Sequence, residues 1–373
     1  MKLLFLYLKA FSLTGGIEKF NRSFLKALNE WSLNQNHVVK ALSPYDNKAD
    51  ERYFPQKNLA GFSGNRILFG FHTLVSMFRC DLTILGHINL SVFGLLLKRI
   101  NPSAKLVLVV HGIEVWGKLS PLKTKLLLES DAIFSVSEFT RRKILENNRA
   151  IDPCKIKILP NPLDPYFKLP TIFEKPSYLH DRYNIHPEAK VLLTVARLSS
   201  TEKYKGYDLV IKALHQSTLR NENMKYLLGG KADQKERLRV QGLISSLGLQ
   251  EVVTLIGFIK DEELADHYLA ADLFVMPSIK EGFGIVFIEA IACGLKVVAG
   301  SKDGSIEAIT SNLFGRLVDP ESLVEIEKTI THQIKEPPLN GSFAQRNVLT
   351  HFGFDVFAKK VNNYLGELGQ SMR

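Results

Sequence analysis

The sequence has few cysteines and few long apolar runs. Its 373 residues include only Cys80, Cys154 and Cys293, widely spaced. Such an odd, sparse set excludes a disulfide framework and is typical of reduced, cytosolic thiols. The N-terminal MKLLFLYLKAF is interrupted by Lys9 and followed by a Gly-Gly pair. It is too short for a signal peptide or a spanning helix, so it predicts a buried first strand in a cytoplasmic protein.

Metal-binding and nucleic-acid-binding patterns are also missing. The sequence has no D-x-D, no HExxH and no paired Cys/His ligands. It has no nucleic-acid recognition motif, no repeats of 20–50 residues and no low-complexity tract. We therefore expect no metal site, no cofactor and no nucleic-acid partner.

Acidic residues are scarce in the first half of the chain. Residues 1–170 contain 24 Lys and Arg against 13 Asp and Glu, whereas 171–373 contain 24 against 25. This asymmetry indicates an anionic partner, and a solvated basic surface is the alternative. Two segments, 66–79 (RILFGFHTLVSMFR) and 90–99 (LSVFGLLLKR), combine apolar residues with terminal basic ones. They suggest peripheral contact with the inner face of the cell membrane, unless both are ordinary core helices.

The length and the patterning predict two α/β domains. Short apolar runs alternate with helical patterns, which is typical of parallel sheets covered by helices. Predicted strands are 2–8, 37–42, 82–86, 105–110, 132–136, 156–159, 190–196, 225–229, 252–256, 273–276 and 296–299. Predicted helices are 17–33, 89–99, 138–147, 206–217, 233–247, 261–270, 285–293 and 354–370.

The proline-rich stretch 160–188 has no periodicity and reads as a linker. We therefore predict two Rossmann-like, doubly wound domains, 1–165 and 180–353, facing across a cleft. A C-terminal helix, about 354–373, is expected to pack back on the first domain. In sheets of this kind ligands lie at the carboxyl ends of the strands, so the loops after strands are the candidate sites.

Two such loops stand out in the first domain. Gly15 and Gly16 lie between a predicted strand and a helix, where backbone N–H groups and a helix N-terminus favour an anion. A tight turn without a ligand is the alternative. His111 follows the apolar strand KLVLVV. Its position favours a functional role over that of a buried structural histidine.

Two further loops stand out in the second domain. Arg197 follows a predicted strand and Lys205 precedes a helix, a pairing that suits a diphosphate, although surface cations are often only solvated. The stretch EGFGIVFIEA places Glu281 in a loop and Glu289 inside the following helix. Gly284 lies at the start of this helix, where its backbone is suited to an anion.

With these residues in view, the chain resembles the GT-B glycosyltransferases of family 4, which are retaining nucleotide-sugar enzymes. The most specific element is E-G-F-G-I-V-F-I-E at 281–289, which resembles the E-x7-E motif of that family. Supporting elements are ARL…KG at 196–206, VSEFTRRKI at 136–144, NPLD at 161–164 and the early Gly-Gly loop.

The resemblance implies a donor-binding role for the E-x7-E residues. Glu281 would contact hydroxyls of the donor sugar, with the backbone of Phe283, Gly284 and Ile285 alongside. Glu289 would bind the ribose hydroxyls of the nucleotide.

The resemblance also implies how the diphosphate would be held. Arg197 and Lys205 would bind it, assisted by Gly15 and Gly16, and His111 would face the sugar. The residues expected to be catalytic are Glu281, His111, Arg197 and Lys205.

The expected activity is transfer of a hexose from a nucleoside diphosphate sugar, UDP-glucose first, with retention and without a metal. The acceptor would be a saccharide or a lipid-linked sugar in polysaccharide biosynthesis. Two alternatives stay open: a sugar-nucleotide epimerase, which needs no acceptor, and a non-catalytic subunit that binds a sugar nucleotide.

Overall fold

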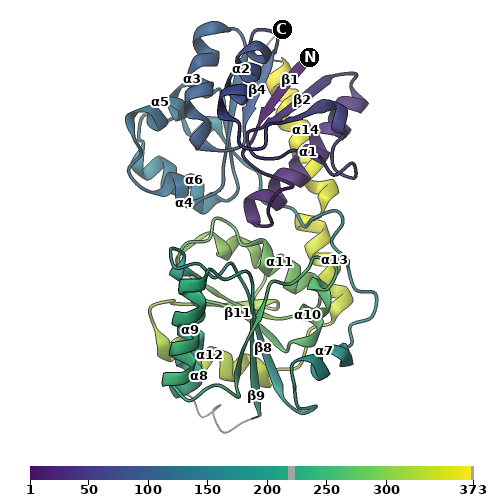
Figure 1. Cartoon of the computed structure of the whole chain (residues 1–373), viewed down its shortest axis with the longest axis vertical. Helices are drawn as coiled ribbons and strands as arrows, with labels where there is room; N and C mark the ends of the chain where they lie inside the picture. Colours follow the sequence, from purple (N-terminus) through teal and green to yellow (C-terminus); the bar gives the residue numbers. More distant parts are fainter. Residues whose placement is uncertain (217–222, 371–373) are drawn as a thin grey trace. The chain divides into compact units, whose positions relative to one another are not determined.

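The computed structural model describes residues 1–216 and 223–370. The chain divides into two compact units: Met1–Pro165 together with Phe352–Arg373 (unit 1), and Tyr166–His351 (unit 2). Each described unit is built on one parallel sheet flanked by helices (Figure 1).

Unit 1 contains a seven-stranded sheet with the order β3-β2-β1-β4-β5-β6-β7. Its strands are β1 (Lys2–Leu6), β2 (Val38–Ser43), β3 (Leu59–Gly61), β4 (Leu82–Leu85), β5 (Lys105–Val110), β6 (Ala132–Ser135) and β7 (Ile156–Ile158). Its helices are α1 (Gly16–Asn34), α2 (Arg66–Met77), α3 (Ser91–Ile100), α4 (Ile113–Trp116), α5 (Pro121–Glu129), α6 (Glu138–Asn147) and α14 (Phe354–Gln370).

Unit 2 contains a six-stranded sheet with the order β10-β9-β8-β11-β12-β13. Its strands are β8 (Lys190–Val195), β9 (Met224–Gly229), β10 (Val253–Gly257), β11 (Leu273–Met276), β12 (Val297–Gly300) and β13 (Gly315–Val318). Its helices are α7 (Ser177–Arg182), α8 (Tyr207–Gln216), α9 (Gln234–Ser246), α10 (Leu264–Ala270), α11 (Ile285–Ala292), α12 (Leu323–Lys335) and α13 (Gly341–Phe352).

Both sheets have the doubly wound order, in which the direction of strand addition reverses once. In unit 1 the reversal lies between β1 and β4, where Leu4 pairs with Thr83. In unit 2 it lies between β8 and β11, where Leu192 pairs with Leu273. The carboxyl ends of these strand pairs are the topological switch points, where ligands bind in folds of this class.

The central strands are buried on both faces. Every residue of β4, β6, β11 and β12 is buried, which explains why these strands read as continuous apolar runs. Successive side chains of a strand point to opposite faces, so helices must cover each sheet on both sides.

The last described helix, α14, belongs to unit 1. It packs along α1, and the ring of Phe357 lies 5.6 Å from that of Phe20, edge to face (Figure 1). Tyr364 donates a hydrogen bond of 3.0 Å to the carbonyl of Ile158 in β7. The C-terminal segment thus completes the core that begins with the first strand.

The predicted α/β class with two doubly wound domains is confirmed. Each predicted strand and helix has a counterpart in the structure. The predicted end of one helix at 217 and the stretch 371–373 lie outside the described residues. Two strands, β3 and β13, were not predicted, and neither were the helices α4, α5, α12 and α13 or the helix inside the predicted linker, α7.

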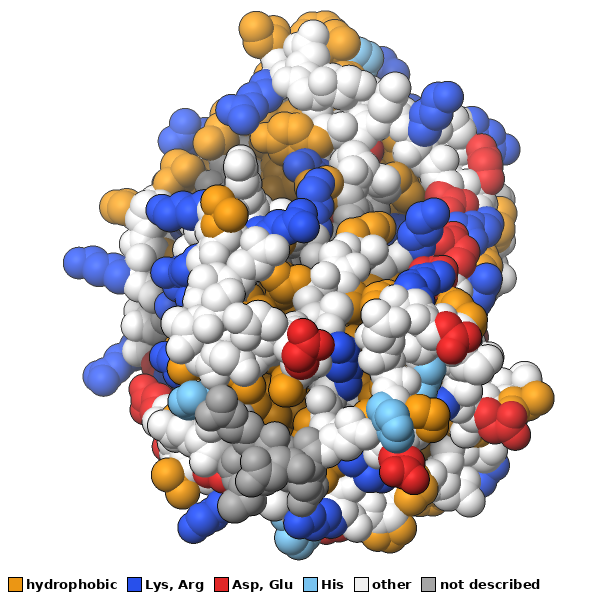
Figure 2. Space-filling model, turned by 60° about the horizontal axis from the view of Figure 1, so that its bottom comes forward, with side chains coloured by type: hydrophobic (Ala, Val, Ile, Leu, Met, Phe, Trp, Pro, Cys, Tyr) orange, Lys and Arg blue, Asp and Glu red, His pale blue; other side chains and the backbone are white. Residues whose placement is uncertain are grey.

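The surface carries many cations, in line with the net charge of +10. On the face shown in Figure 2, Lys and Arg side chains outnumber Asp and Glu. No helix in the described part of the chain combines the length and apolar character needed to cross a bilayer.

Candidate active site

The predicted site residues of unit 2 lie at its switch point. Arg197 comes two residues after β8, and Glu281 lies in the loop after β11, the strand that pairs with β8. A backbone hydrogen bond of 3.0 Å from the N–H of Ile279 to the carbonyl of Tyr204 joins the two loops. Residues 197–206 (the 197 loop) and 277–284 (the 281 loop) therefore form one continuous surface.

The 197 loop turns sharply before α8. Gly206 has φ +82°, and a Cβ at this position would lie 2.3 Å from the carbonyl oxygen of Pro277. Only glycine fits here, because the backbone is left-handed and is in close contact with the neighbouring loop. This turn carries Lys205 to the start of α8, beside the 281 loop.

Lys205 and Glu281 form an ion pair, with Nζ donating to Oε1. Both side chains are only 15% exposed. Lys205 Nζ also lies 5.5 Å from the ring centroid of Tyr204, and Lys280 Nζ lies 5.9 Å from the same ring. Burial raises the pKa of Tyr204, so its hydroxyl stays neutral beside these cations.

Arg197 is paired as well, but on the outside of the same loop. Its guanidinium donates to Oε1 of Glu202, and its side chain is 65% exposed. The two cationic side chains that were predicted to bind a diphosphate, Arg197 and Lys205, thus already have carboxylate partners within the protein. An anionic ligand at this loop must compete with Glu202 and Glu281.

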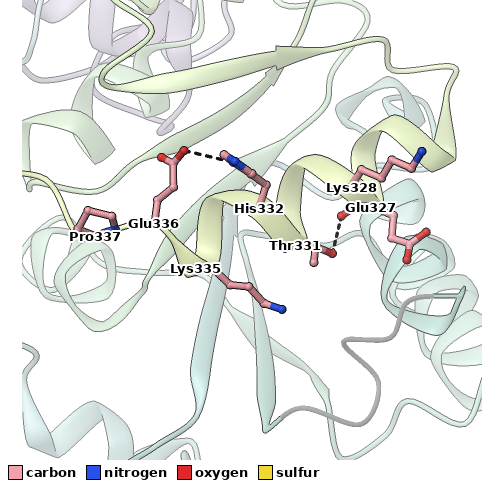
Figure 3. A pocket seen from close by; sticks show the side chains of 7 residues that line it. All are labelled: Glu327, Lys328, Thr331, His332, Lys335, Glu336 and Pro337. Atoms are coloured by element: carbon pink, nitrogen blue, oxygen red, sulfur yellow. Dashed lines mark hydrogen bonds and ion pairs between the residues drawn. The ribbon is translucent and has the colours of Figure 1, made fainter.

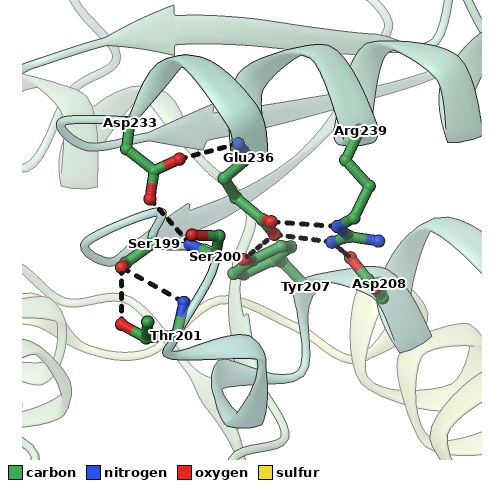
Figure 4. Close-up of polar contacts among 8 residues, drawn as sticks. All are labelled: Ser199, Ser200, Thr201, Tyr207, Asp208, Asp233, Glu236 and Arg239. Carbon is green, nitrogen blue, oxygen red and sulfur yellow. Dashed lines mark hydrogen bonds and ion pairs between the residues drawn. The ribbon is translucent and has the colours of Figure 1, made fainter.

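A polar network between α9 and the start of α8 supports the 197 loop (Figure 4). Asp233 caps α9 by accepting from the N–H of Glu236 at 2.8 Å, and it also accepts from the N–H of Ser200 at 2.7 Å. These backbone hydrogen bonds lower the pKa of Asp233. The cap therefore ties the loop to the helix.

Glu236 anchors the other end of this network and is fully buried. It accepts hydrogen bonds from Tyr207 at 2.5 Å and from Arg239 at 2.6 Å, and Arg239 also donates to Asp208 at 2.6 Å (Figure 4). Burial alone would raise the pKa of Glu236, but the hydrogen bonds from Arg239 and Tyr207 lower it overall. The hydrogen bond to Glu236 therefore fixes Tyr207, the residue that follows Gly206.

The 281 loop leads into α11 through glycine. Gly284 has φ +84° and stands at the N-cap of α11, with Phe283 buried before it and Ile285 buried after it. Glu289 lies inside the helix at 0% exposure and accepts a hydrogen bond of 2.9 Å from Tyr268. The two acids of the motif therefore differ: Glu281 lines the loop surface, whereas Glu289 is enclosed.

A further acid, Asp303, lies under the 281 loop and was not predicted. It follows β12, is fully buried, and accepts from the backbone N–H of Glu281 at 2.8 Å. Burial raises its pKa to about 6. The only signal in the sequence was its position in an Asp-Gly pair just after a predicted strand.

In unit 1 the predicted glycines begin α1. Gly15 is the N-cap with an extended backbone, and Gly16 is the first helical residue. A Cβ at Gly16 would meet no other atom within 4 Å, so the fold itself does not require glycine there. The loop before them is held by buried Asp46, which accepts from the N–H groups of Ala10 at 2.8 Å and Ser12 at 3.0 Å.

His111 lies at the carboxyl end of β5, as predicted. Its Nε2 is 2.8 Å from the carbonyl oxygen of Gly86. Because a carbonyl only accepts, Nε2 carries the proton and Nδ1 is the acceptor in the neutral ring. The ring lies edge to face against Phe20, with centroids 5.1 Å apart.

A second histidine, His87, accompanies His111 and was not predicted. Their ring centroids are 6.2 Å apart, and Nδ1 of His87 accepts from the N–H of Asn89 at 3.0 Å. Burial lowers the pKa of His87 to about 4. His87 follows β4, so the switch point of unit 1 carries two histidines, and the lowered pKa keeps His87 neutral near pH 7.

The structure thus groups the predicted residues in two sets. Arg197, Lys205 and Glu281 lie together in unit 2, whereas Gly15, Gly16 and His111 lie at strand ends of unit 1. The residues described in the structure include no group of three or more His, Cys, Asp or Glu side chains that could hold a metal ion.

A cavity of about 680 Å³ lies elsewhere in unit 2, along α12. Its lining residues come from this helix and the residues just after it, from Glu327 to Pro337. Figure 3 shows that their side chains diverge rather than converge: Lys335 and Glu336 point in opposite directions. This groove contains no predicted site residue and has no arrangement suited to a small ligand.

Two family models match the chain, one for each unit. Residues 14–167 match the family described as Glycosyltransferase Family 4, and residues 178–348 match Glycosyl transferases group 1. The fold is similar to that of HepE from Anabaena in a crystal structure with UDP-glucose. The TM-score is 0.79 at 20% identity, over 98% of this chain and all of that one.

The chain belongs to family 4 of the GT-B glycosyltransferases. Among curated relatives, this family 4 chain is 26% identical over 292 residues to a GDP-mannose-dependent phosphatidylinositol monomannoside mannosyltransferase of Mycobacterium tuberculosis, covering 72% of this chain and 71% of that one. It is 28% identical over 215 residues to an uncharacterized glycosyltransferase of Methanocaldococcus jannaschii. That alignment covers 56% of this chain and about half, 53%, of the relative.

Proposed function

We propose that the protein transfers a hexose from a nucleoside diphosphate sugar to a saccharide or a lipid-linked sugar, with retention. The observation that carries the proposal is the meeting of Lys205 and Glu281 at the switch point of unit 2, with Arg197 on the same loop. A cation and a carboxylate side by side suit a ligand that is anionic at one end and rich in hydroxyls at the other.

In this proposal Arg197 and Lys205 bind the diphosphate and stabilise the charge that develops on it as the sugar leaves. Such electrostatic stabilisation is usually the largest contribution to catalysis, and here it needs no metal. Glu281 exchanges its bond with Lys205 for hydrogen bonds from sugar hydroxyls. The backbone of Phe283, Gly284 and Ile285 lies alongside.

The remaining predicted residues complete the proposed complex. Glu289 would accept from the ribose hydroxyls, which requires the ribose to reach a carboxylate that is enclosed by Tyr268 and the helix. Gly15 and Gly16 would lie against the diphosphate. His111 would accept a hydrogen bond from a sugar hydroxyl at Nδ1, because its Nε2 already donates to the carbonyl of Gly86.

For retention we propose attack of the acceptor on the same face as the departing phosphate. Retaining hydrolases instead use one carboxylate as a nucleophile and a second as an acid. Glu281 is occupied by Lys205 and Glu289 is buried, which disfavours either as a nucleophile.

UDP-glucose is the first donor to test, in a pathway of polysaccharide biosynthesis. HepE binds UDP-glucose according to its structure, whereas the mycobacterial relative is named for GDP-mannose. A thermal-shift panel of nucleotide sugars identifies the donor, and a crystal structure with that donor tests the contacts. Greater stabilisation by GDP-mannose would change the donor and keep the reaction class.

An epimerase would be revealed by a new sugar nucleotide formed from donor alone, without acceptor. A binding subunit would bind the donor and form no product with any acceptor. NMR of the product anomer decides between retention and inversion.

We also propose reversible peripheral binding of unit 1 to anionic membranes, through α2. The apolar side chains of α2 fall into two sets: Phe69 and Met77 face the core, while others are exposed. The exposed ones, together with Phe78 at the C-cap of the helix, are Ile67, Leu68, Phe71, Leu74 and Val75, with exposures from 36% to 87%. Their spacing puts them on one helical stripe.

Charge around this stripe fits anionic lipid. Arg66 is the first residue of α2 and Arg79 follows its C-cap, and both are exposed. Between residues 52 and 113 the only acidic residue is Asp81, against seven basic ones. An apolar stripe bordered by basic residues is the pattern of an interfacial helix.

A further inference from the structure

Asp303 is a fully buried carboxylate that forms four hydrogen bonds. Oδ1 accepts from the backbone N–H of Ser305 at 3.0 Å and from the Ser305 hydroxyl. Oδ2 accepts from the Ser278 hydroxyl at 2.7 Å and from the backbone N–H of Glu281 at 2.8 Å. All four donors are neutral, and each oxygen receives two of them.

The residue after Asp303 holds the same part of the 281 loop. The N–H of Gly304 donates to the carbonyl oxygen of Glu281 at 2.8 Å. A Cβ at Gly304 would lie 2.1 Å from the carbonyl oxygen of Gly282, so only glycine allows this approach. Asp303 and Gly304 therefore bind both backbone polar groups of Glu281.

We propose that Asp303 is a positioning residue that fixes the backbone of Glu281 so that its carboxylate meets the donor sugar. The proposal rests on the proposed function, since it assigns Glu281 to the sugar. Glu281 must release Lys205 when the donor binds, and its side chain then swings between two partners. A fixed backbone confines that movement to the side chain, and such preorganisation improves the geometry of binding and reaction.

The chemistry of the site requires a carboxylate. Two oxygens accept four donors, including two backbone N–H groups that cannot reverse their direction. An asparagine has one acceptor and one NH2, so its NH2 would face the N–H of Glu281 or that of Ser305. Asp303→Asn therefore keeps the shape of the side chain and loses the hydrogen bond from one of the two backbone N–H groups, that of Glu281 or that of Ser305.

The test compares UDP-glucose with bare UDP by calorimetry, together with kcat and KM. For Asp303→Asn we expect about tenfold weaker binding of UDP-glucose and about tenfold lower kcat, as for the loss of a charge-assisted hydrogen bond. Binding of bare UDP should stay within about twofold. The matched control is Ser305→Ala, which removes a donor from Oδ1 only and should leave both affinities unchanged.

Equal weakening of UDP and UDP-glucose in Asp303→Asn would overturn the proposal, because Asp303 would then act on the whole unit. Unchanged binding and kcat in both Asp303→Asn and Asp303→Ala, which leaves the N–H of Glu281 without this acceptor in any orientation, would overturn it too. Hydrogen exchange of the wild-type protein gives an answer that does not depend on a folded variant: the Glu281 amide should be protected, and an unprotected amide refutes the contact. If the wild-type protein binds no nucleotide sugar, the proposed function fails, while the exchange result still decides whether Asp303 holds Glu281.

Discussion

Lys205 Nζ donates to Oε1 of Glu281, although the two residues are 76 positions apart in the chain. The pair joins the loop after β8 to the loop after β11, and each side chain is 15% exposed. A diphosphate that binds Lys205 takes the place of this carboxylate. The free protein thus holds a carboxylate where we expect the anionic ligand.

Glu281→Gln removes the competitor for Lys205. We expect bare UDP to bind as well as to the wild type or up to about fivefold more tightly, since a partly exposed ion pair contributes about 1 kcal/mol or less. UDP-glucose should lose its advantage over UDP, because the hydroxyl acceptor is weakened. Calorimetry with both ligands measures this, and weaker binding of bare UDP would contradict the assignment.

Removing either cation of the 197 loop should weaken the binding of bare UDP. For Arg197→Ala and for Lys205→Ala the expected loss of binding free energy is about 1.5–3 kcal/mol, the value of a charge-assisted hydrogen bond. Lys280→Ala is the matched control, because Lys280 approaches the same Tyr204 ring and has no proposed diphosphate contact. A loss in Lys280→Ala equal to that in Lys205→Ala would mean that only the general positive charge matters.

Binding of the donor should not require a divalent cation, because Arg197 and Lys205 supply the positive charge. The affinity for UDP-glucose in a chelator should equal that in magnesium or manganese. Loss of binding in the chelator, restored by either metal, would refute this prediction.

Attachment to vesicles should depend on both the apolar stripe and the basic residues of α2. Ile67→Ser with Phe71→Ser should reduce co-sedimentation with anionic vesicles by about tenfold or more, since each side chain buries apolar surface in the interface. Leu238→Ser is the control, because Leu238 is 62% exposed on α9 of unit 2. Protein that stays in the supernatant with anionic vesicles at low salt would contradict membrane binding.

The basic residues can be tested separately. Arg66→Gln with Arg79→Gln should weaken binding to anionic vesicles and reduce its sensitivity to salt, because screening acts on these charges. Neutral vesicles should bind neither the variants nor the wild type appreciably. Salt dependence that is unchanged in the variant would place the electrostatic contact elsewhere.

His87 should make the stability of unit 1 depend on pH. Burial lowers its pKa from 6.5 to about 4, opposed by Glu114 and reinforced by His111 and Lys123. Between these values the unfolded chain binds a proton that the folded protein excludes, so stability falls as the pH falls from about 6.5 to 4. The loss is at most about 3 kcal/mol.

Urea denaturation of the wild type and of His87→Asn measures this contribution. Asparagine can still accept from the N–H of Asn89, so the turn should persist while the titrating group is removed. The stability difference between the two proteins should change over this pH range. A constant difference would show that His87 titrates normally.

The sequence predicted the central strands and the loops that follow them, because buried strands such as β5 and β8 form unbroken apolar runs. It did not predict β3 and β13, which are short edge strands with mixed burial and little apolar pattern. The helices α4, α5, α7, α12 and α13 were also missed; α4 and α7 have four and six residues, too few for a periodic signal.

The site residues were predicted from their positions in the sequence, not from contacts. Lys205 and Glu281 each lie in a loop that follows a predicted strand, which indicates the carboxyl edge of a sheet. Their ion pair could not be predicted, because it depends on the pairing of β8 with β11. Asp46 and Asp303 were missed for a similar reason: an aspartate beside a turn is common, and only the fold brings distant N–H groups to it.

The route of the chain through the two units has a consequence for biosynthesis. Unit 2 is one continuous segment, Tyr166–His351, whereas unit 1 needs α14, which is synthesised only after all of unit 2. The core around Phe20 and Phe24 stays open until Phe357 arrives. Unit 2 can therefore finish folding first, although its synthesis begins second, and a nascent chain released before α14 has one complete unit and one exposed apolar groove.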